Sequence, residues 1–412
     1  MAPSGRNACF VHRACPLLPG WPHRSSGKTT RMSDTVSKAL LPAGLRDFLP
    51  PDAALEAHVV SGLMADFGAH GYERVKPPLI EFEENLLDGA GAATSKDTFR
   101  MMDPVSQRMM GLRADMTIQV ARIATTRLSK APRPLRLCYS GQVLRVKGTQ
   151  LNPERQFTQA GLELIGSDSP AADAEVMALT AGALTALGVQ GVSVDLNLPT
   201  LVPVLCDEME LSPETQLRLR AALDQKDAAA VREMGGPIQD LFGELIRCSG
   251  EVDTVLDRLG QIDLPQAAAQ RRDRLKTVVA LVRRLMPGLS LTVDAVENRG
   301  FEYHTGISFS IFAPGARGEL ARGGRYRAGS AKEKAVGCTV YVDTVMGVIA
   351  PPADRPRLLL PYGDRAQAAA WQSKGWVTVA MLEDGVADPE AEARRQRCTH
   401  YVSNGQVRAV GG

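Results

Sequence analysis

The segment 157–164 alternates polar and apolar side chains, and this pattern strongly constrains the fold of the 412-residue chain. Successive side chains of an extended strand point to opposite faces. One face would carry Phe157, Gln159, Gly161 and Glu163, and the other Thr158, Ala160, Leu162 and Leu164. Two interpretations stay open for the first face. It is either the floor of a pocket, where Phe157 stacks a ring and Glu163 holds a cationic amine, or the solvated side of an antiparallel strand.

The segments around this strand predict an α+β fold, with an antiparallel sheet flanked by helices. Apolar residues recur at helical spacing from Leu55 to Phe67, and Ser169-Pro170 is typical of the start of another helix. Hairpin-like spacing with few helices between strands favours an antiparallel sheet over a doubly wound one. The strands are expected near residues 72–75, 108–112, 135–144, 157–165 and 192–196.

The composition shifts toward Ala, Leu, Gln, Arg and Glu between residues 199 and 288. This shift favours a helical insertion of about four helices. Its basic pairs, Arg271-Arg272 and Arg283-Arg284, are interpreted as part of a solvated helix face in preference to a nucleic-acid patch.

The two ends of the chain are expected to differ from its core. Residues 1–40 are predicted to be a disordered or non-native extension, because 1–31 is basic and lacks Asp and Glu. A transit peptide has a similar composition. Pro351-Pro352 belongs to a linker, and short apolar strands alternate with helical patterns beyond it. The predicted parts are the extension 1–40, a core formed by 41–198 and 289–350, the insertion 199–288, and a short α/β C-terminal domain at 351–412.

The bulk composition agrees with a cytoplasmic globular protein. The net charge of +2 gives no broad electrostatic argument for nucleic acid. Seven scattered cysteines without C-x-x-C spacing are interpreted as reduced thiols, so neither a disulfide framework nor a metal site is expected. No apolar run approaches the roughly 18 residues that span a bilayer. Motifs for independent catalytic chemistry are absent from the sequence, and no cofactor is expected.

Several motifs in a fixed order resemble those of the class II aminoacyl-tRNA synthetases, in particular the histidyl-tRNA synthetase branch. Arg145 and the returning strand 155–163 resemble motif 2 of that class, and 71–81 resembles motif 1, whose Pro77 would lie at a dimer interface. Three further similarities are found at 112–117, at 299–306, and at 323–326 with 335–337, which resembles the approach to motif 3. The resemblance spans about 41–350 and implies the antiparallel sheet of that class.

The resemblance also implies a binding site for histidine. Asp115, Thr117 and Glu163 would meet the ammonium group, and an arginine would hold the carboxylate. Alternatives remain open: Asp115 as a turn residue, an Arg145–Glu163 ion pair in an empty pocket, and a structural role for Arg299. Tyr303 could be a core aromatic, and His304 stands where the family has Tyr. The implied site consists of Asp115, Thr117, Arg145, Gln159, Glu163, Arg299, Tyr303 and His304.

The nucleotide-binding positions of the synthetase pattern are changed. Counted without gaps, Lys147, Gly148 and Pro153 replace residues that bind ATP in the motif 2 loop. Thr344 stands where motif 3 has its Arg, and Tyr341 replaces a Gly. Each lost charge-assisted contact costs roughly 1.5–3 kcal/mol, so histidine activation is expected to fail.

A retained amino-acid pocket with a lost ATP site is similar to the regulatory subunits of short-form ATP phosphoribosyltransferases. That resemblance implies a non-catalytic subunit that supports the first step of histidine biosynthesis. It also implies a catalytic-subunit partner, L-histidine as effector, self-association around Pro77 and no tRNA. The alternative is a histidyl-tRNA synthetase with a divergent ATP site.

Overall fold

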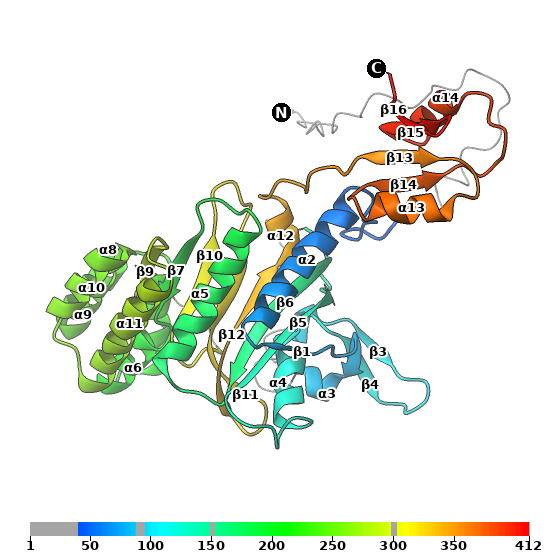
Figure 1. Ribbon diagram of the computed structural model, residues 1–412. Helices are drawn as coiled ribbons and strands as arrows, with labels where there is room; N and C mark the ends of the chain where they lie inside the picture. The colour runs from blue at the N-terminus through cyan, green and yellow to red at the C-terminus, as the bar shows by residue number, and fades with distance from the viewer. Residues whose placement is uncertain (1–39, 88–94, 149–152, 298–302, 412) are drawn as a thin grey trace, which may run out of the picture. The chain divides into compact units, whose positions relative to one another are not determined.

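The computed structural model describes residues 40–87, 95–148, 153–297 and 303–411 (Figure 1). The described residues before Gly44 lie outside the main unit of the chain, and the architecture below is that of the unit beginning at Gly44. The predicted extension 1–40 lies outside the described residues except for Leu40, so its character stays a prediction.

A nine-stranded mixed sheet forms the centre of the larger unit. Its strands are β1 (Glu73–Arg74), β5 (Leu135–Leu144), β6 (Gln156–Ile165), β7 (Ser193–Asn197), β8 (Ser249–Glu251), β9 (Ser290–Asp294), β10 (Ser308–Phe312), β11 (Ala321–Ala328) and β12 (Glu333–Tyr341). Six of them pair antiparallel in the order β5-β6-β12-β11-β10-β7, which confirms the predicted antiparallel core. The sheet is mixed and not purely antiparallel, because β1, expected as a strand near 72–75, adds parallel to β5, and β9 adds parallel to β7 and carries β8.

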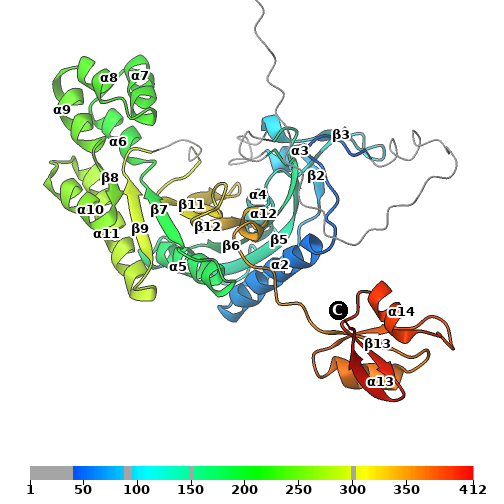
Figure 2. The same cartoon turned by 90° about the horizontal axis from the view of Figure 1, so that it is seen from above.

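Two long helices, α2 (Asp52–Ala69) and α5 (Pro170–Ala186), lie along one face of this sheet (Figure 2). Ser169 caps α5 as predicted, because its side chain accepts a hydrogen bond from the backbone N–H of Ala171. Leu162 and Leu164 of β6 pack on this side in the main hydrophobic core. The apolar half of the alternating strand therefore faces the helices.

The other face of β6 is buried as well. Phe157 belongs to a second core that contains Tyr139 of β5 and Val120 of α4 (Thr117–Thr125). The interpretation of β6 as a strand with one solvated face is therefore wrong. The alternation indicated that the two faces of β6 differ. It could not indicate that α4, about forty positions earlier in the chain, covers the second face.

The region 199–288 is helical as expected, but it contains six helices and the strand β8. The count exceeds the expected four because short breaks divide the helical pattern, one at Asp227, which caps α8, and one at Gly235, with φ of 65°. The helices are α6 (Leu201–Glu208), α7 (Pro213–Asp224), α8 (Ala228–Glu233), α9 (Gly236–Leu245), α10 (Val252–Gln261) and α11 (Gln266–Leu285). Val282 of α11 and Val293 of β9 share the main core, so these helices pack on the sheet. The boundaries of the insertion as a domain stay a prediction.

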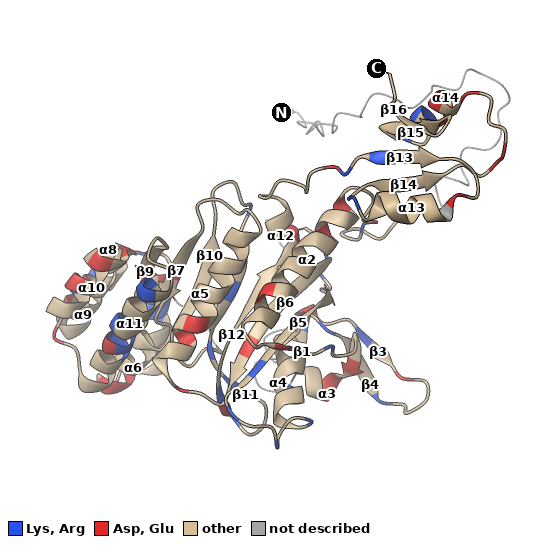
Figure 3. Ribbon diagram, viewed as in Figure 1, with Lys and Arg blue, Asp and Glu red and all other residues tan. Residues whose placement is uncertain are grey.

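One member of each basic pair of α11 contacts an acidic side chain. Figure 3 marks the basic and acidic residues along the helices of this region. Arg283 forms two hydrogen bonds with Asp253 of α10, at 2.6 and 2.7 Å, and Arg272 contacts Asp273 at 3.0 Å. These contacts favour the interpretation as a helix face over a nucleic-acid patch.

Two smaller sheets complete the described structure. The first has the order β2-β4-β3 and follows the motif 1 prolines; its elements are β2 (Ile80–Phe82), α3 (Glu83–Leu86), β3 (Arg100–Met102) and β4 (Met109–Leu112). The second has the order β14-β13-β15-β16 and lies in the predicted C-terminal α/β domain, whose boundaries stay a prediction. Its elements are β13 (Arg357–Leu360), α13 (Arg365–Gln372), β14 (Val377–Ala380), α14 (Pro389–Arg395), β15 (His400–Ser403) and β16 (Gln406–Ala409).

Among the described residues, no helix combines the length and apolar character needed to cross a membrane. Cys138, Cys206, Cys248, Cys338 and Cys398 are free and buried.

Candidate ligand-binding site

A buried carboxylate, that of Glu163, lies at the centre of the polar face of β6, with 1% of its residue surface exposed. Tyr326 of β11 donates a hydrogen bond to its Oε2 at 2.8 Å, and Tyr139 of β5 donates to its Oε1 at 3.3 Å. The hydroxyl of Thr339 on β12 lies 2.9 Å from the Tyr139 hydroxyl. These four strands are neighbours in the sheet, so side chains on one face converge around Glu163.

A second polar group lies where α4 begins. Gln159 donates through Nε2 to Asp115 Oδ2 at 3.0 Å, and its Oε1 accepts from the backbone N–H of Met116 at 3.1 Å. The backbone N–H of Thr117 donates to Asp115 Oδ1 at 2.8 Å, while its hydroxyl lies 3.2 Å from that of Tyr139. A continuous series of polar contacts therefore runs from Asp115 to Glu163.

Two glycines make room for this arrangement. A Cβ at Gly337 would overlap the Glu163 carboxylate, and a Cβ at Gly161 would overlap the end of the Tyr139 ring. Gly337 is the register partner of Glu163 on β12, and Gly161 is that of Tyr139 on β6. The absence of a side chain at these two positions thus leaves the space that the Glu163 carboxylate and the Tyr139 phenol occupy.

Burial changes the titration of these groups. It raises the pKa of Glu163 to about 8; the nearby Asp115 charge raises it further, whereas the hydrogen bond from Tyr326 lowers it. Burial and the Glu163 charge hold the pKa values of Tyr139 and Tyr326 well above their ordinary range. Both phenols therefore stay protonated at neutral pH and can donate. A carboxylate in such a site favours a ligand that brings positive charge or N–H donors.

Arg145 does not form the ion pair with Glu163 that one alternative proposed. Its guanidinium lies over the ring of Phe157, 5.0 Å from the ring centroid. The Tyr341 ring lies 6.4 Å from that of Phe157, at an interplanar angle of 58°. Arg145 thus closes one end of the polar face through a cation–π contact.

Tyr303 and His304 differ in exposure. The His304 ring is buried against Gly324 of β11, where a Cβ would overlap it. The partly exposed Tyr303 ring has its centroid 4.0 Å from that of His304. The idea that Tyr303 is a core aromatic does not hold. Arg299 lies outside the described residues, so its proposed contact with a carboxylate stays a prediction.

The motif 2 loop closes tightly at its base. A Cβ at Gly148 would overlap the backbone of Pro153, so the two ends of the loop lie in contact. On the motif 3 side, Asp343 of α12 (Val342–Met346) accepts a hydrogen bond from the backbone N–H of Thr158 at 2.9 Å. Two of the positions that bind ATP in the synthetase pattern, Gly148 and Pro153, therefore lie against each other.

Tyr139, Tyr326 and Thr339 were not included among the predicted site residues. The strand register supplies the missing signal: Leu137 and Gly337 pair with Glu163, and Tyr139 and Thr339 lie two positions along the same strands, on the same face. Tyr326 was visible in the motif at 323–326 but was not linked to Glu163. No group of His, Cys, Asp and Glu side chains suited to a metal ion occurs in the described part of the chain.

The fold and the polar cluster define a protein of the class II aminoacyl-tRNA synthetase type. A sequence model of the family "Histidyl-tRNA synthetase" matches residues 44–345. A solved structure named as an ATP phosphoribosyltransferase regulatory subunit/histidyl-tRNA synthetase, from Bacillus halodurans, has a TM-score of 0.74 and 22% identity, over 89% of this chain and 97% of that one. A histidyl-tRNA synthetase from Nostoc has a TM-score of 0.72 and 19% identity, over 88% and 91% of the two chains. At these identities the structures establish the fold alone.

Two relatives in sequence are more specific. The ATP phosphoribosyltransferase regulatory subunit of Paramagnetospirillum magneticum is 59% identical over 372 residues, which cover 90% of this chain and 98% of the relative. The protein of the same name from Rhodospirillum centenum is 56% identical, over 91% of this chain and 97% of the relative. The chain belongs to the family of ATP phosphoribosyltransferase regulatory subunits. This membership confirms the predicted regulatory role in histidine biosynthesis.

Proposed function

We propose that this subunit is a non-catalytic histidine sensor that binds L-histidine in the cluster around Asp115 and Glu163. The observation that carries the proposal is the buried Glu163 carboxylate with its two phenol donors. Burial raises the pKa of Glu163 to about 8, so the acid holds a proton in the empty protein at neutral pH, and its ionisation is favoured only by a group that compensates the charge. A ligand with an ammonium group and an imidazole brings a positive charge and N–H donors to this face. Asp115, Thr117 and Gln159 suit the ammonium group, and Glu163 suits the imidazole.

The absence of catalysis is inferred from the nucleotide side of the cluster. An Arg side chain at position 148 would overlap the backbone of Pro153, so the loop geometry leaves no room for a phosphate-binding residue there. Thr344 cannot supply the charge of the missing motif 3 Arg. Without these contacts the transition state of amino-acid activation loses its electrostatic stabilisation. Histidine-dependent pyrophosphate exchange by the purified chain should equal that of a blank, and exchange above the blank would favour the synthetase alternative.

The partner is inferred to be a short catalytic chain of ATP phosphoribosyltransferase, and the place of action is inferred to be the cytoplasm. A solved structure named as an ATP phosphoribosyl transferase complex, from Thermotoga maritima, contains a chain with the same fold, at a TM-score of 0.56 and 18% identity. A sensor regulates its partner only if histidine binds one state of the complex better than another, and about 1–3 kcal/mol of coupling is sufficient.

Self-association is inferred for the β2-β4-β3 sheet next to Pro77. Register places Met101 opposite Met110, on the same face as Ile80. Ile80 is 38% exposed and Met101 39% exposed, so this face presents apolar surface to solvent. Contiguous exposed apolar surface is typical of protein interfaces.

The decisive experiment compares Glu163→Ala and Glu163→Gln in the complex with the catalytic chain. Glu163→Ala should abolish histidine binding and inhibition while phosphoribosyl transfer without histidine stays near the parent value. Glu163→Gln keeps the shape and should give a smaller loss. Glu333→Gln serves as a matched control, because Glu333 pairs with Arg133 and not with the cluster. Full inhibition of the Glu163→Ala complex by histidine would show that the site is elsewhere.

A further inference from the structure

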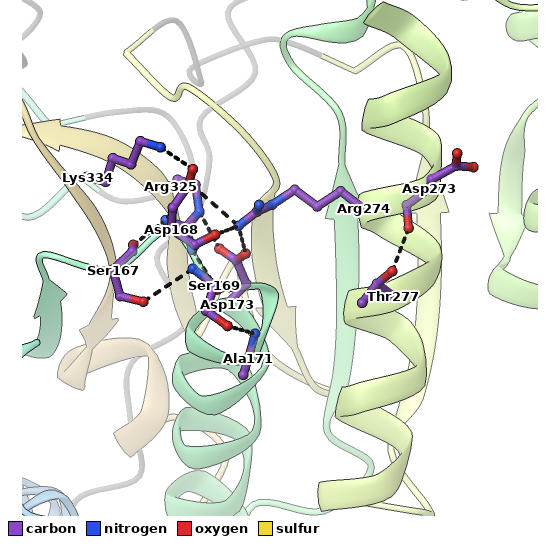
Figure 4. A network of polar contacts seen from close by, with 10 residues as sticks. All are labelled: Ser167, Asp168, Ser169, Ala171, Asp173, Asp273, Arg274, Thr277, Arg325 and Lys334. Atoms are coloured by element: carbon purple, nitrogen blue, oxygen red, sulfur yellow. Dashed lines mark hydrogen bonds and ion pairs between the residues drawn. The ribbon is translucent and has the colours of Figure 1, made fainter. Parts of the chain in front are cut away.

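A buried charge network joins the helical region to the sheet (Figure 4). Asp173, in the first turn of α5, is fully buried and binds two arginines. Its Oδ1 accepts from Nε of Arg325 on β11 at 2.9 Å, and its Oδ2 accepts from Arg274 on α11 at 2.7 Å. One carboxylate therefore connects α11, α5 and β11, which are far apart in the sequence.

Arg325 is held through all of its guanidinium nitrogens. Besides Asp173, it donates to the carbonyl oxygen of Ser167 at 2.7 Å and to that of Ser169 at 3.1 Å. Burial alone would raise the pKa of Asp168, but Lys334, Arg325 and Arg274 outweigh this and lower it, so the network keeps a second anion. A planar guanidinium with this many partners has one permitted position.

The neighbours of Arg325 belong to the candidate site. Tyr326 follows it on β11, points to the opposite face of the strand, and donates to Glu163 at 2.8 Å. The carbonyl oxygen of Arg325 accepts from the backbone N–H of Thr305 at 2.7 Å, directly after His304. The position of the Arg325 backbone therefore sets the position of a Glu163 donor and of the segment that carries His304.

Arg274 is the weaker connection. A single terminal nitrogen reaches Asp173 and the carbonyl oxygen of Asp168, the latter at 2.9 Å. Its Nε is buried and has no hydrogen-bond partner in the described structure. A buried network that is only partly satisfied at one member can rearrange there at lower cost than elsewhere.

We propose that Arg325 is a positioning residue that links helix α11 to the histidine site, so that histidine affinity depends on the contact between Arg274 and Asp173. This rests on the proposed function and names the part of the fold that senses the bound ligand. A shift of α11 moves the Asp173 carboxylate, and this moves the Arg325 guanidinium. Because Tyr326 follows Arg325 on β11, the position of its hydroxyl changes as well. By thermodynamic reciprocity, bound histidine must also restrain α11.

The first test compares two arginines of one helix, Arg274→Met and Arg283→Met, in the full chain. Arg283 pairs with Asp253 and does not contact the network. Isothermal titration with histidine should show an affinity loss of about fivefold for Arg274→Met. Arg283→Met should change affinity less than twofold. Thermal unfolding of both variants checks that they are folded, and Asp173 keeps Arg325 as a partner in each. Equal effects of the two substitutions would overturn the proposal.

A structural defect alone could also weaken binding, so the second test is a double-mutant cycle. In a Tyr326→Phe background the Arg274→Met substitution should no longer weaken histidine binding, because the hydroxyl through which it acts is missing. Amide hydrogen exchange of 266–285 should slow with saturating histidine in the parent but not in Arg274→Met. Additive effects, or no histidine-dependent protection of α11 in a parent that binds histidine, would refute the link. A parent that binds no histidine would refute the proposed function and this inference with it.

Discussion

Gly337 on β12 is the register partner of Glu163 on β6, and the Glu163 carboxylate occupies the space that a Cβ at Gly337 would take. The buried acid can exist at this point of the sheet only because the next strand carries no side chain there. This pairing makes Gly337 part of the candidate site, although it offers no functional group.

Gly337→Ala should therefore impair histidine binding. The added methyl group must displace the carboxylate or push the strands apart, and such overpacking costs about 1–3 kcal/mol. We expect at least a tenfold loss of histidine affinity and a lower unfolding midpoint. Gly182→Ala is the control, because a Cβ there meets nothing within 4 Å inside α5. A Gly337→Ala protein with unchanged affinity would mean that Glu163 does not contact the ligand.

The stability of the empty protein should depend on pH through Glu163. Burial raises its pKa from the ordinary 4.5 to about 8, so between these values the folded state holds a proton that the unfolded state has released. The stabilising contribution is thus complete below about pH 4.5 and is lost as pH rises toward 8. Each pH unit inside this window changes the unfolding free energy by up to about 1.4 kcal/mol. The unfolding free energy, measured by urea unfolding, should fall with pH across this range in the parent more steeply than in Glu163→Gln. Parallel pH profiles of the two proteins would contradict the raised pKa of Glu163.

Arg113 should be essential for holding the motif 1 segment. It is buried and donates to the carbonyl oxygens of Pro77 at 3.0 Å and Gln142 at 2.8 Å. Arg113→Met leaves these acceptors without a donor, which we expect to lower the unfolding free energy by about 2–4 kcal/mol. The exposed Arg108, which pairs with Glu84, provides the comparison. Arg108→Met should change stability by less than about 1 kcal/mol. Similar losses for both would count against the assigned role.

Self-association should respond to one face of the small sheet and not to the other. Met101 and Met102 are neighbours on β3 and point to opposite faces, with Met101 on the side of Ile80. Met101→Asp introduces a charge into the proposed interface, so the sedimentation coefficient should fall to that of a monomer. Met102→Asp, which is 59% exposed in the parent, should leave the assembly intact. An oligomer that survives Met101→Asp would place the interface elsewhere.

The sequence pattern predicted β5 and β6 close to their observed bounds, and it predicted the start of α5 at Ser169. At these places the hydrophobic pattern and the turn-forming residues agree. The alternation placed Gln159 and Glu163 on one polar face of β6, whereas Asp115 and Thr117 were included through the resemblance to histidyl-tRNA synthetases. The pattern could not show that Arg145 stacks on Phe157, because the end point of a long side chain depends on the surrounding loops. The pattern also could not show the contact between Arg113 and Pro77. Its acceptor is a backbone carbonyl 36 positions away, and every residue has such a carbonyl whatever its side chain. The strand expected near 72–75 is present as β1, but its parallel pairing with β5 and that of β9 with β7 could not be predicted, since side-chain alternation within one strand does not indicate the direction of its neighbour.

The hydroxyl of Tyr139 has a consequence for ligand choice. A phenol carries one proton, and when that proton is given to Glu163, the oxygen can only accept from its other neighbours. Thr117 and Thr339, whose hydroxyls lie 3.2 and 2.9 Å away, can then only donate to that oxygen, and a Thr117 hydroxyl that does so keeps its lone pairs for another donor. Beside it Asp115 is an acceptor too. With the protons in this direction, Thr117 and Asp115 both present acceptors, so the proposed histidine site should bind a ligand with an amine group more tightly than an analogue from which the amine has been removed.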